Sequence, residues 1–285
     1  MNRRYKRIRL WPMYTSVVTA ILVSHLSESA RGELPGSASA VAEQSDSHPL
    51  DPALEIANES LQHSQADIQD YTATLFKRLR IKGELQKHQT MFVKVRNRKM
   101  ENGRLATPLS VYLRFLNPES VKGREVIWVE GQNSGKIIAH ETGFKNLLRV
   151  HIEPTGFIAM RNQRYPVSDI GLENLVVKLI ETGKRDRKYG ECDVQFFKNT
   201  KVGNRACTTI QVIHPVKRSH FDFYCARLYF DNELNLPIRY ESWSWPPQTG
   251  GEPVLDEEYT YTNIQVNVGL TDGDFDPDNA EYDYP

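Results

Sequence analysis

Apolar and polar side chains alternate along the chain between residues 71 and 115. Residues 71–81 place one apolar set on a single face, namely Ala73, Leu75, Leu79 and Ile81. Phe76 and Lys77 break this alternation once, which predicts a β-bulge at that point. Segments 91–96 and 109–115 repeat the period of two. This period predicts antiparallel strands that have one packed face and one solvated face.

Further short strands are expected in the rest of the chain. Residues 125–130 and 136–139 flank a glycine-bearing turn and predict a β-hairpin. The other expected strands cover residues 147–152, 192–197, 207–213, 221–230, 237–245 and 257–268. Together these segments predict a sheet of roughly nine to eleven strands, a number that suits a half-barrel.

Two segments show helical spacing instead. Asp51-Pro52 predicts the start of a helix that ends between residues 65 and 70. Residues 168–183 carry an apolar stripe, with Ser168 as the expected N-cap and Gly183 as the expected terminator. Few helices among many strands favour an α+β fold. We expect a curved antiparallel β-sheet, an open half-barrel, with these helices covering its concave face.

The first thirty residues predict a secretory signal peptide. A run of five basic residues within positions 3–9 precedes a mostly apolar stretch at Met13–Leu26, and small residues follow it. Cleavage is expected after Ser29 or Gly32, and an uncleaved signal anchor is the alternative. No cysteine near this site offers a lipid attachment point. We therefore divide the chain into a signal peptide (1–30), a disordered linker (31–50) and one domain (51–285), exported to the periplasm or cell envelope.

No motif in the sequence completes a catalytic site. Gly131–Lys136 resembles a phosphate-binding loop, but it joins two predicted strands, whereas such a loop must open a helix. Ser219, His220 and Asp222 have the residue types of a triad, yet a triad is assembled from distant positions. We expect no enzyme activity and no cofactor.

Metal and nucleic-acid binding are not expected either. The acidic tail alternates aspartates from Asp272 to Asp278, but Pro277 stands where a calcium loop requires glycine. His214 and His220 flank a predicted hairpin tip, where exposed histidines are usually solvated. The formal net charge is +0, so no general attraction to nucleic acid is predicted.

Charge is nevertheless unevenly distributed. Residues 77–104 hold ten Lys or Arg and two acids, whereas residues 252–285 hold ten acids and no Lys or Arg. We interpret both segments as solvated faces, because salt screens exposed charges beyond about 8 Å. The alternatives are that the two segments attract each other, or that the basic one meets anionic headgroups.

The chain has three cysteines, Cys192, Cys207 and Cys225. A hairpin centred on Val216 would place Cys207 opposite Cys225, at a separation that a disulfide can bridge. Cys192 is an equally available partner if the register differs, and an odd count leaves at least one thiol over.

The apolar strand faces are the main functional signal. A curved sheet with an apolar concave side encloses a space that is either core or a lipid-sized cavity. The candidate cavity residues are Leu75, Met91, Val93, Val111, Leu113 and Leu175.

Several segments resemble an uncharacterised family of secreted bacterial proteins over about residues 52–285. These segments are residues 123–131, Ala159-Met160, Tyr165-Pro166, 170–175, 236–240 and 259–264 with Asp274-Phe-Asp276. More loosely, the opening helix, the Tyr71-Thr-Ala-Thr-Leu strand and the Leu-Pro-Ile-Arg strand start resemble the periplasmic lipoprotein carriers of the LolA/LolB-like superfamily. That resemblance implies an open half-barrel that binds lipid or lipoprotein without catalysis.

Three functions follow from these observations. The first is non-catalytic binding or carriage of a lipid, acyl chain or lipoprotein in the envelope. The second is an envelope structural or protein-interaction module with a filled core and an envelope protein as partner. The third is a hydrolase of unknown substrate. The sequence carries no signal for an oligomeric state.

Overall fold

The computed structural model describes residues 47–143 and 147–285. The predicted signal peptide and residues 31–46 of the predicted linker lie outside these ranges. Helix α1 (Asp51–Asp67) begins at the predicted Asp51-Pro52 and ends within the predicted interval. Leu50, the last residue of the predicted linker, is buried against the core. No helix in the described ranges is long and apolar enough to cross a membrane.

The second long helix, α2 (Leu172–Asp186), separates two groups of strands along the chain. Those before it are β1 (Asp70–Ile81), β2 (Glu84–Leu85), β3 (Gln89–Arg96), β4 (Lys99–Glu101), β5 (Arg104–Thr107), β6 (Ser110–Asn117), β7 (Glu125–Val129), β8 (Ile137–His140) and β9 (Val150–Ile152). Those after it are β10 (Asp193–Val202), β11 (Arg205–Ile213), β12 (Cys225–Asp231), β13 (Pro237–Ser244) and β14 (Val254–Val266). Short 3₁₀ helices include η4 (Val167–Asp169) and η5 (Asp272–Phe275).

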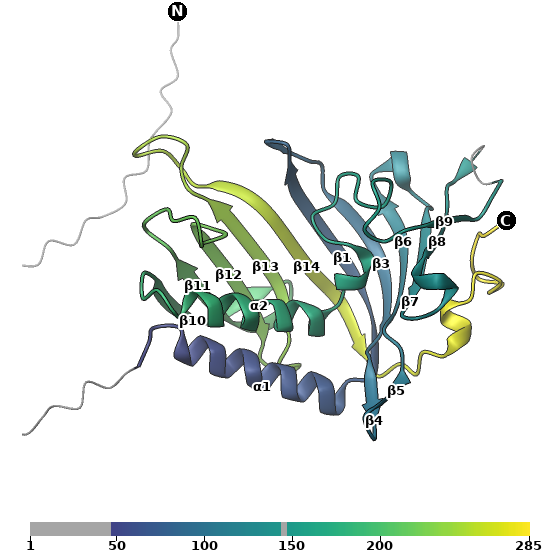
Figure 1. Cartoon of the computed structure of the whole chain (residues 1–285), viewed down its shortest axis with the longest axis horizontal. Helices are drawn as coiled ribbons and strands as arrows, with labels where there is room; N and C mark the ends of the chain where they lie inside the picture. Colours follow the sequence, from purple (N-terminus) through teal and green to yellow (C-terminus); the bar gives the residue numbers. More distant parts are fainter. Residues whose placement is uncertain (1–46, 144–146) are drawn as a thin grey trace, which may run out of the picture. The chain divides into compact units, whose positions relative to one another are not determined.

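One antiparallel sheet contains nearly all of these strands. Its order is β10-β11-β12-β13-β14-β1-β3-β6-β7-β8-β9, with β2 paired to β1, while β4 and β5 form a separate hairpin. The first and last strands in this order are not paired with each other, so the sheet stays open. Both α1 and α2 lie across one face of it and pack against each other (Figure 1). This arrangement confirms the predicted α+β fold with an open, curved antiparallel sheet.

The alternation in β1 runs without a break, so the predicted bulge at Phe76 and Lys77 is wrong. Phe76 is exposed, whereas Lys77 is only 8% exposed and shares the helix-covered face with Leu75 and Leu79. The register of β1 against β14 shifts instead between Thr72 and Thr74. Lys77 therefore points into the protein, in phase with the apolar positions of its strand.

The start and end of α2 also differ from the prediction. Ser168 belongs to η4, and Gly171, with a φ of 135°, occupies the N-cap position of α2. The backbone N–H of Leu172 donates to the buried Tyr71 hydroxyl at 2.9 Å, which fixes the start of the helix to β1. Gly183 lies inside the helix, where a β-carbon would be 2.8 Å from Leu54 Cδ2. A glycine at this position therefore allows α1 and α2 to approach closely.

The predicted Cys207–Cys225 disulfide is wrong. Cys207 lies opposite Asp231, and Cys225 lies opposite Ile213, so the β11–β12 hairpin is centred three residues later than expected. The two cysteines are thus six residues apart along the ladder, about 20 Å. Cys192, Cys207 and Cys225 are all buried free thiols.

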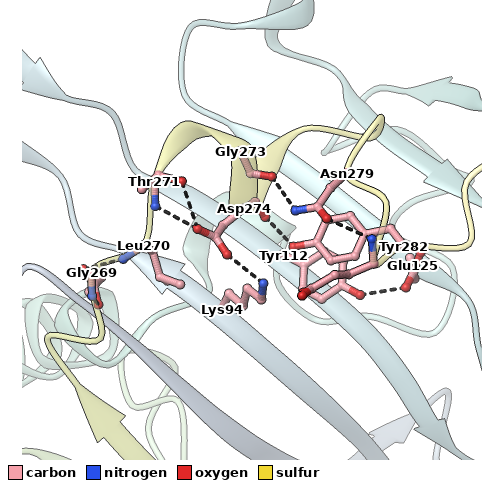
Figure 2. Close-up of polar contacts among 12 residues, drawn as sticks. Lys94, Tyr112, Glu125, Gly269, Leu270, Thr271, Gly273, Asp274, Asn279 and Tyr282 are labelled. Carbon is pink, nitrogen blue, oxygen red and sulfur yellow. Dashed lines mark hydrogen bonds and ion pairs between the residues drawn. The ribbon is translucent and has the colours of Figure 1, made fainter.

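The acidic tail is anchored to the sheet, although most of its carboxylates stay exposed as expected, with Asp272 87%, Asp278 73% and Asp283 66% exposed. Asp70 accepts the backbone N–H groups of residues 268, 269 and 270 and so fixes the chain where it leaves β14. Asp274 then binds Lys94 at 2.7 Å (Figure 2). Asp272 pairs with Arg96 at the same distance. Phe275 is buried against Tyr112, Ile127 and Val129, on the face opposite the helices. The basic and acidic segments therefore do attract each other.

Candidate ligand-binding cavity

A cavity of about 730 Å³ lies between the two helices and the face of the sheet that they cover. Small-ligand sites usually enclose about 300–1,000 Å³. Its walls come from α1, α2, the segment 163–171 and six neighbouring strands, from β11 to β3 in sheet order. The cavity therefore lies over one half of the sheet.

The wall formed by β11, β12 and the helices is apolar. Cross-strand pairing sets Ile210 beside Leu228 and Val212 beside Ala226 on the face that α1 and α2 cover. Further apolar side chains on this wall are Leu50, Ala53, Leu54, Ala57, Leu175, Leu179, Phe223 and Phe230. Each of these two cross-strand pairs is part of a row of paired residues that continues across β13, β14 and β1. In those three strands the side chains of the rows that line the cavity are polar.

The continuation of the rows is polar. Leu228 lies opposite Tyr240, Tyr240 opposite Tyr259, and Tyr259 opposite Lys77. In the next row, Ala226 lies opposite Ser242 and Ser242 opposite Glu257. All of these side chains line the cavity. One surface therefore passes from an apolar half to a polar half within a few strand spacings.

Glu257 is the buried carboxylate of the polar half. It accepts hydrogen bonds from the hydroxyls of Tyr165 at 3.1 Å, Tyr259 at 3.3 Å and Ser242 at 3.3 Å. Arg164 Nε lies 3.8 Å from Glu257 Oε2. Burial raises the pKa of the Glu257 carboxyl, and the Arg164 charge and the three donors act against that rise. The carboxylate is thus held by groups of the protein itself.

Lys77 is the buried ammonium of the polar half. Its Nζ donates to Gln163 Oε1 at 2.5 Å, the only acceptor that this ammonium has among the described residues. No carboxylate of these residues lies within ion-pair distance of it. Burial lowers the pKa of Lys77 to about 8. Arg164 partly compensates Glu257, so Lys77 is the cation of this wall that lacks a counter-charge.

The predicted cavity residues divide into two groups. Leu75, Met91 and Leu175 line the cavity. Val93, Val111 and Leu113 lie on the same face of the sheet but belong to the packed core cluster that also contains Val167 and Leu172. That any of the six contacts a ligand stays a prediction.

Five polar wall residues were missed by sequence reasoning, namely Lys77, Arg164, Tyr165, Glu257 and Tyr259. Two of them carried a usable signal. Lys77 is in phase with Leu75 and Leu79, and Glu257 is in phase with Tyr261, which is buried. Strict period-two phasing would have placed both side chains on the covered face. Arg164 and Tyr165 lie in an irregular segment that has no period to follow.

Comparison with known proteins gives a family and several distant structures. No curated protein matches the chain. The Mycobacterium tuberculosis lipoprotein LppX is 13% identical, with 78% of this chain and 98% of that chain covered and a TM-score of 0.41. A putative outer membrane lipoprotein-sorting protein domain from Vibrio parahaemolyticus is also 13% identical, with coverage of 78% and 95% and a TM-score of 0.37.

A LolA superfamily protein from Nitrosomonas europaea is 9% identical, with coverage of 77% and 97% and a TM-score of 0.31. All three TM-scores are below 0.5, and these structures therefore carry no functional argument here. The family match is more extensive, because residues 68–284 match a family described as a protein of unknown function, DUF1571. The chain therefore belongs to the DUF1571 family.

Proposed function

We propose that the protein binds a lipid or an acyl chain in the cavity between its helices and its sheet, without catalysis, and carries or retains that ligand in the cell envelope. The single observation that carries this proposal is the cavity of about 730 Å³ with one apolar half and one polar half. A molecule that buries an alkyl chain gains about 0.8 kcal/mol for each methylene removed from water. A polar head can then meet the wall formed by β13, β14 and β1.

The hydrogen bonds and the ion pair of the Glu257 carboxylate favour a binding role over acid–base chemistry. Three hydroxyl donors and Arg164 already engage this carboxylate, so it is held as an acceptor inside the wall. The tyrosines around it have their pKa values raised by burial, which keeps their hydroxyls protonated as donors. Such a wall can orient a ligand while its own protons stay in place.

The export step of the proposal rests on residues 1–32. The basic run and the apolar stretch predict translocation and cleavage. N-terminal sequencing of the full chain recovered from the periplasmic fraction is expected to begin at Ala30 or Glu33. Recovery of uncleaved chain from the cytoplasmic fraction alone would contradict envelope localisation. It would leave the proposal of ligand binding in the cavity unaffected.

A cavity-filling variant tests the binding step. Ala226 is a buried residue of the cavity floor, whereas Ala206 is exposed on the neighbouring strand β11. Ala226→Phe fills the floor, and Ala206→Phe is the matched control because it makes the same change outside the cavity. Circular dichroism and thermal unfolding confirm that both variants fold.

Native mass spectrometry and a fluorescent fatty acid, 11-(dansylamino)undecanoic acid, provide the readouts. Wild type and Ala206→Phe are expected to bind the dansyl probe saturably and to retain co-purifying acyl species. Ala226→Phe is expected to lose both. A ligand-free mass together with no saturable dansyl binding in wild type would overturn the proposal and favour the envelope structural module with a filled core.

A further inference from the structure

We propose that the ligand of this cavity is an anionic amphiphile, and that the Lys77 ammonium binds its carboxylate or phosphate headgroup. This inference rests on the proposed function and adds the chemical class of the ligand. It comes from the position of one charged side chain that the fold buries without a counter-charge. Lys77 is 8% exposed and lines the cavity.

The hydrogen bonds of Lys77 are incomplete. An ammonium has three N–H donors, and Gln163 Oε1 accepts one of them. No other acceptor for Lys77 occurs in the described part of the chain. A buried charge normally has a partner, because transfer from water to a protein interior is costly for an unpaired ion. The oxygens of an anionic headgroup beside the Lys77 ammonium would accept charge-assisted hydrogen bonds from the two remaining N–H donors.

The neighbouring charges leave Lys77 available to an anion. Glu257, which faces the same wall, is held by Arg164 and by three hydroxyl donors. Four other carboxylates line the cavity. Asp222 and Asp186 both bind Arg185 near the far end of α2. Asp169 and Glu181 are exposed, and Lys178 lies on the same helix as Glu181. Among Lys77, Arg164 and Glu257, the local balance is therefore one positive charge.

The apolar wall begins beside this charge. From Lys77 the same row of the sheet passes through Tyr259 and Tyr240 to Leu228 and Ile210. Four strand spacings of about 4.8 Å separate its ends, a span of about 19 Å. An alkyl chain attached to a headgroup at Lys77 can thus lie along the row and reach the apolar wall under α1 and α2.

Four ligands with the same twelve-carbon chain test the inference. Dodecanoate and dodecyl phosphate carry an anionic head, dodecanol carries none, and dodecyltrimethylammonium carries a cation. Each is titrated against delipidated protein loaded with the uncharged fluorophore N-phenyl-1-naphthylamine. The carboxyl carbon of dodecanoate is one of its twelve carbons, so its alkyl chain is one methylene shorter, which is worth about fourfold in affinity. Larger differences in displacement report the headgroup. The ratio of dodecanoate to dodecyl phosphate affinity distinguishes a carboxylate ligand from a phosphate ligand.

Three variants locate the effect. Lys77→Met removes the charge, Lys77→Arg keeps it, and Lys87→Met removes an exposed lysine as the matched control. Wild type, Lys77→Arg and Lys87→Met are expected to bind at least one of the two anions about 10- to 100-fold more tightly than dodecanol, the range for a hydrogen-bonded ion. In Lys77→Met this preference should disappear while dodecanol binding stays.

The unfavourable outcomes are distinct. Equal affinity of wild type for all four ligands would overturn the inference and leave the proposed function standing. An anion preference that persists in Lys77→Met would overturn the assignment to Lys77. Failure of every ligand to displace the fluorophore would overturn the proposed function and the inference together.

Discussion

Replacing Lys77 with methionine should stabilise the delipidated protein near neutral pH. Burial lowers the pKa of the Lys77 ammonium from 10.5 to about 8. Each pKa unit corresponds to about 1.4 kcal/mol, so holding this group charged in the folded state at pH 7 costs about 3 kcal/mol. Methionine leaves Gln163 Oε1 without its donor, which costs about 1–2 kcal/mol. The expected net gain in the free energy of unfolding is therefore about 1–2 kcal/mol.

The effect has a defined pH dependence. Because the pKa of Lys77 is lower in the folded state than in the unfolded state, the unfolded chain binds more protons between pH 8 and 10.5. The stability contribution of Lys77 therefore rises with pH across this window. The advantage of Lys77→Met should be full at pH 7 and should shrink as pH rises from about 8 toward about 10.

Urea unfolding followed by tryptophan fluorescence at pH 7 and at pH 9.5 measures both effects. Lys87→Met, at an exposed position, should change the free energy of unfolding by less than about 0.5 kcal/mol at either pH. A loss of about 3 kcal/mol or more in Lys77→Met would refute the reasoning. That loss would show that the ammonium has an anionic partner within the protein, as expected when one member of a buried ion pair is removed.

Three further predictions concern the fold around the cavity. Phe275→Ala, which empties the apolar contact under the tail, should lower the free energy of unfolding by about 3–5 kcal/mol in the same urea assay. Gly183→Leu should lower it by about 1–3 kcal/mol, because a side chain there overlaps Leu54; an unchanged midpoint would show that the helices can separate at no cost. Titration with a thiol reagent should find three reactive cysteines per unfolded chain without prior reduction, and fewer in the folded protein.

The strands were predictable wherever local periodicity decides the structure. In β1 and β3 the side chains alternate between a covered and an uncovered face, and the sequence shows this period directly. The β11–β12 register was not predictable, because it depends on where the hairpin tip lies. Phe221 and Phe223 fold into the protein before β12 begins, and the backbone pairing starts between His214 and Tyr224. This shifts the centre of the hairpin away from the expected position.

The packing of the tail depends on contacts between residues that are far apart in sequence. Asp274 and Lys94 are 180 residues apart in sequence, and nothing local indicates that they pair. The attachment of the tail was missed because Phe275 and the ion pairs act together: the apolar contact brings the aspartates close to the basic strand face. Composition alone shows the charges but cannot show the apolar contact that holds the tail against the sheet.

The division of the sheet into a packed half and a half that borders the cavity follows from where α2 begins. Its first residue is bound to Tyr71 on β1, and Val167 in the segment before it belongs to the same core cluster as Val93 and Val111. From that point α2 runs over β14 to β11 beside α1 (Figure 1), leaving the cavity beneath the two helices. The polar rows lie where the two halves meet.

That location explains why a costly group such as Lys77 is tolerated. In the packed half, a buried ammonium would be surrounded by side chains that cannot accept its hydrogen bonds. At the edge of the cavity the same ammonium can keep its charge and meet a ligand, while Gln163 orients it from the covering segment. The sheet thus uses one periodic pattern to build a core at one end and a charged, partly apolar cavity wall at the other.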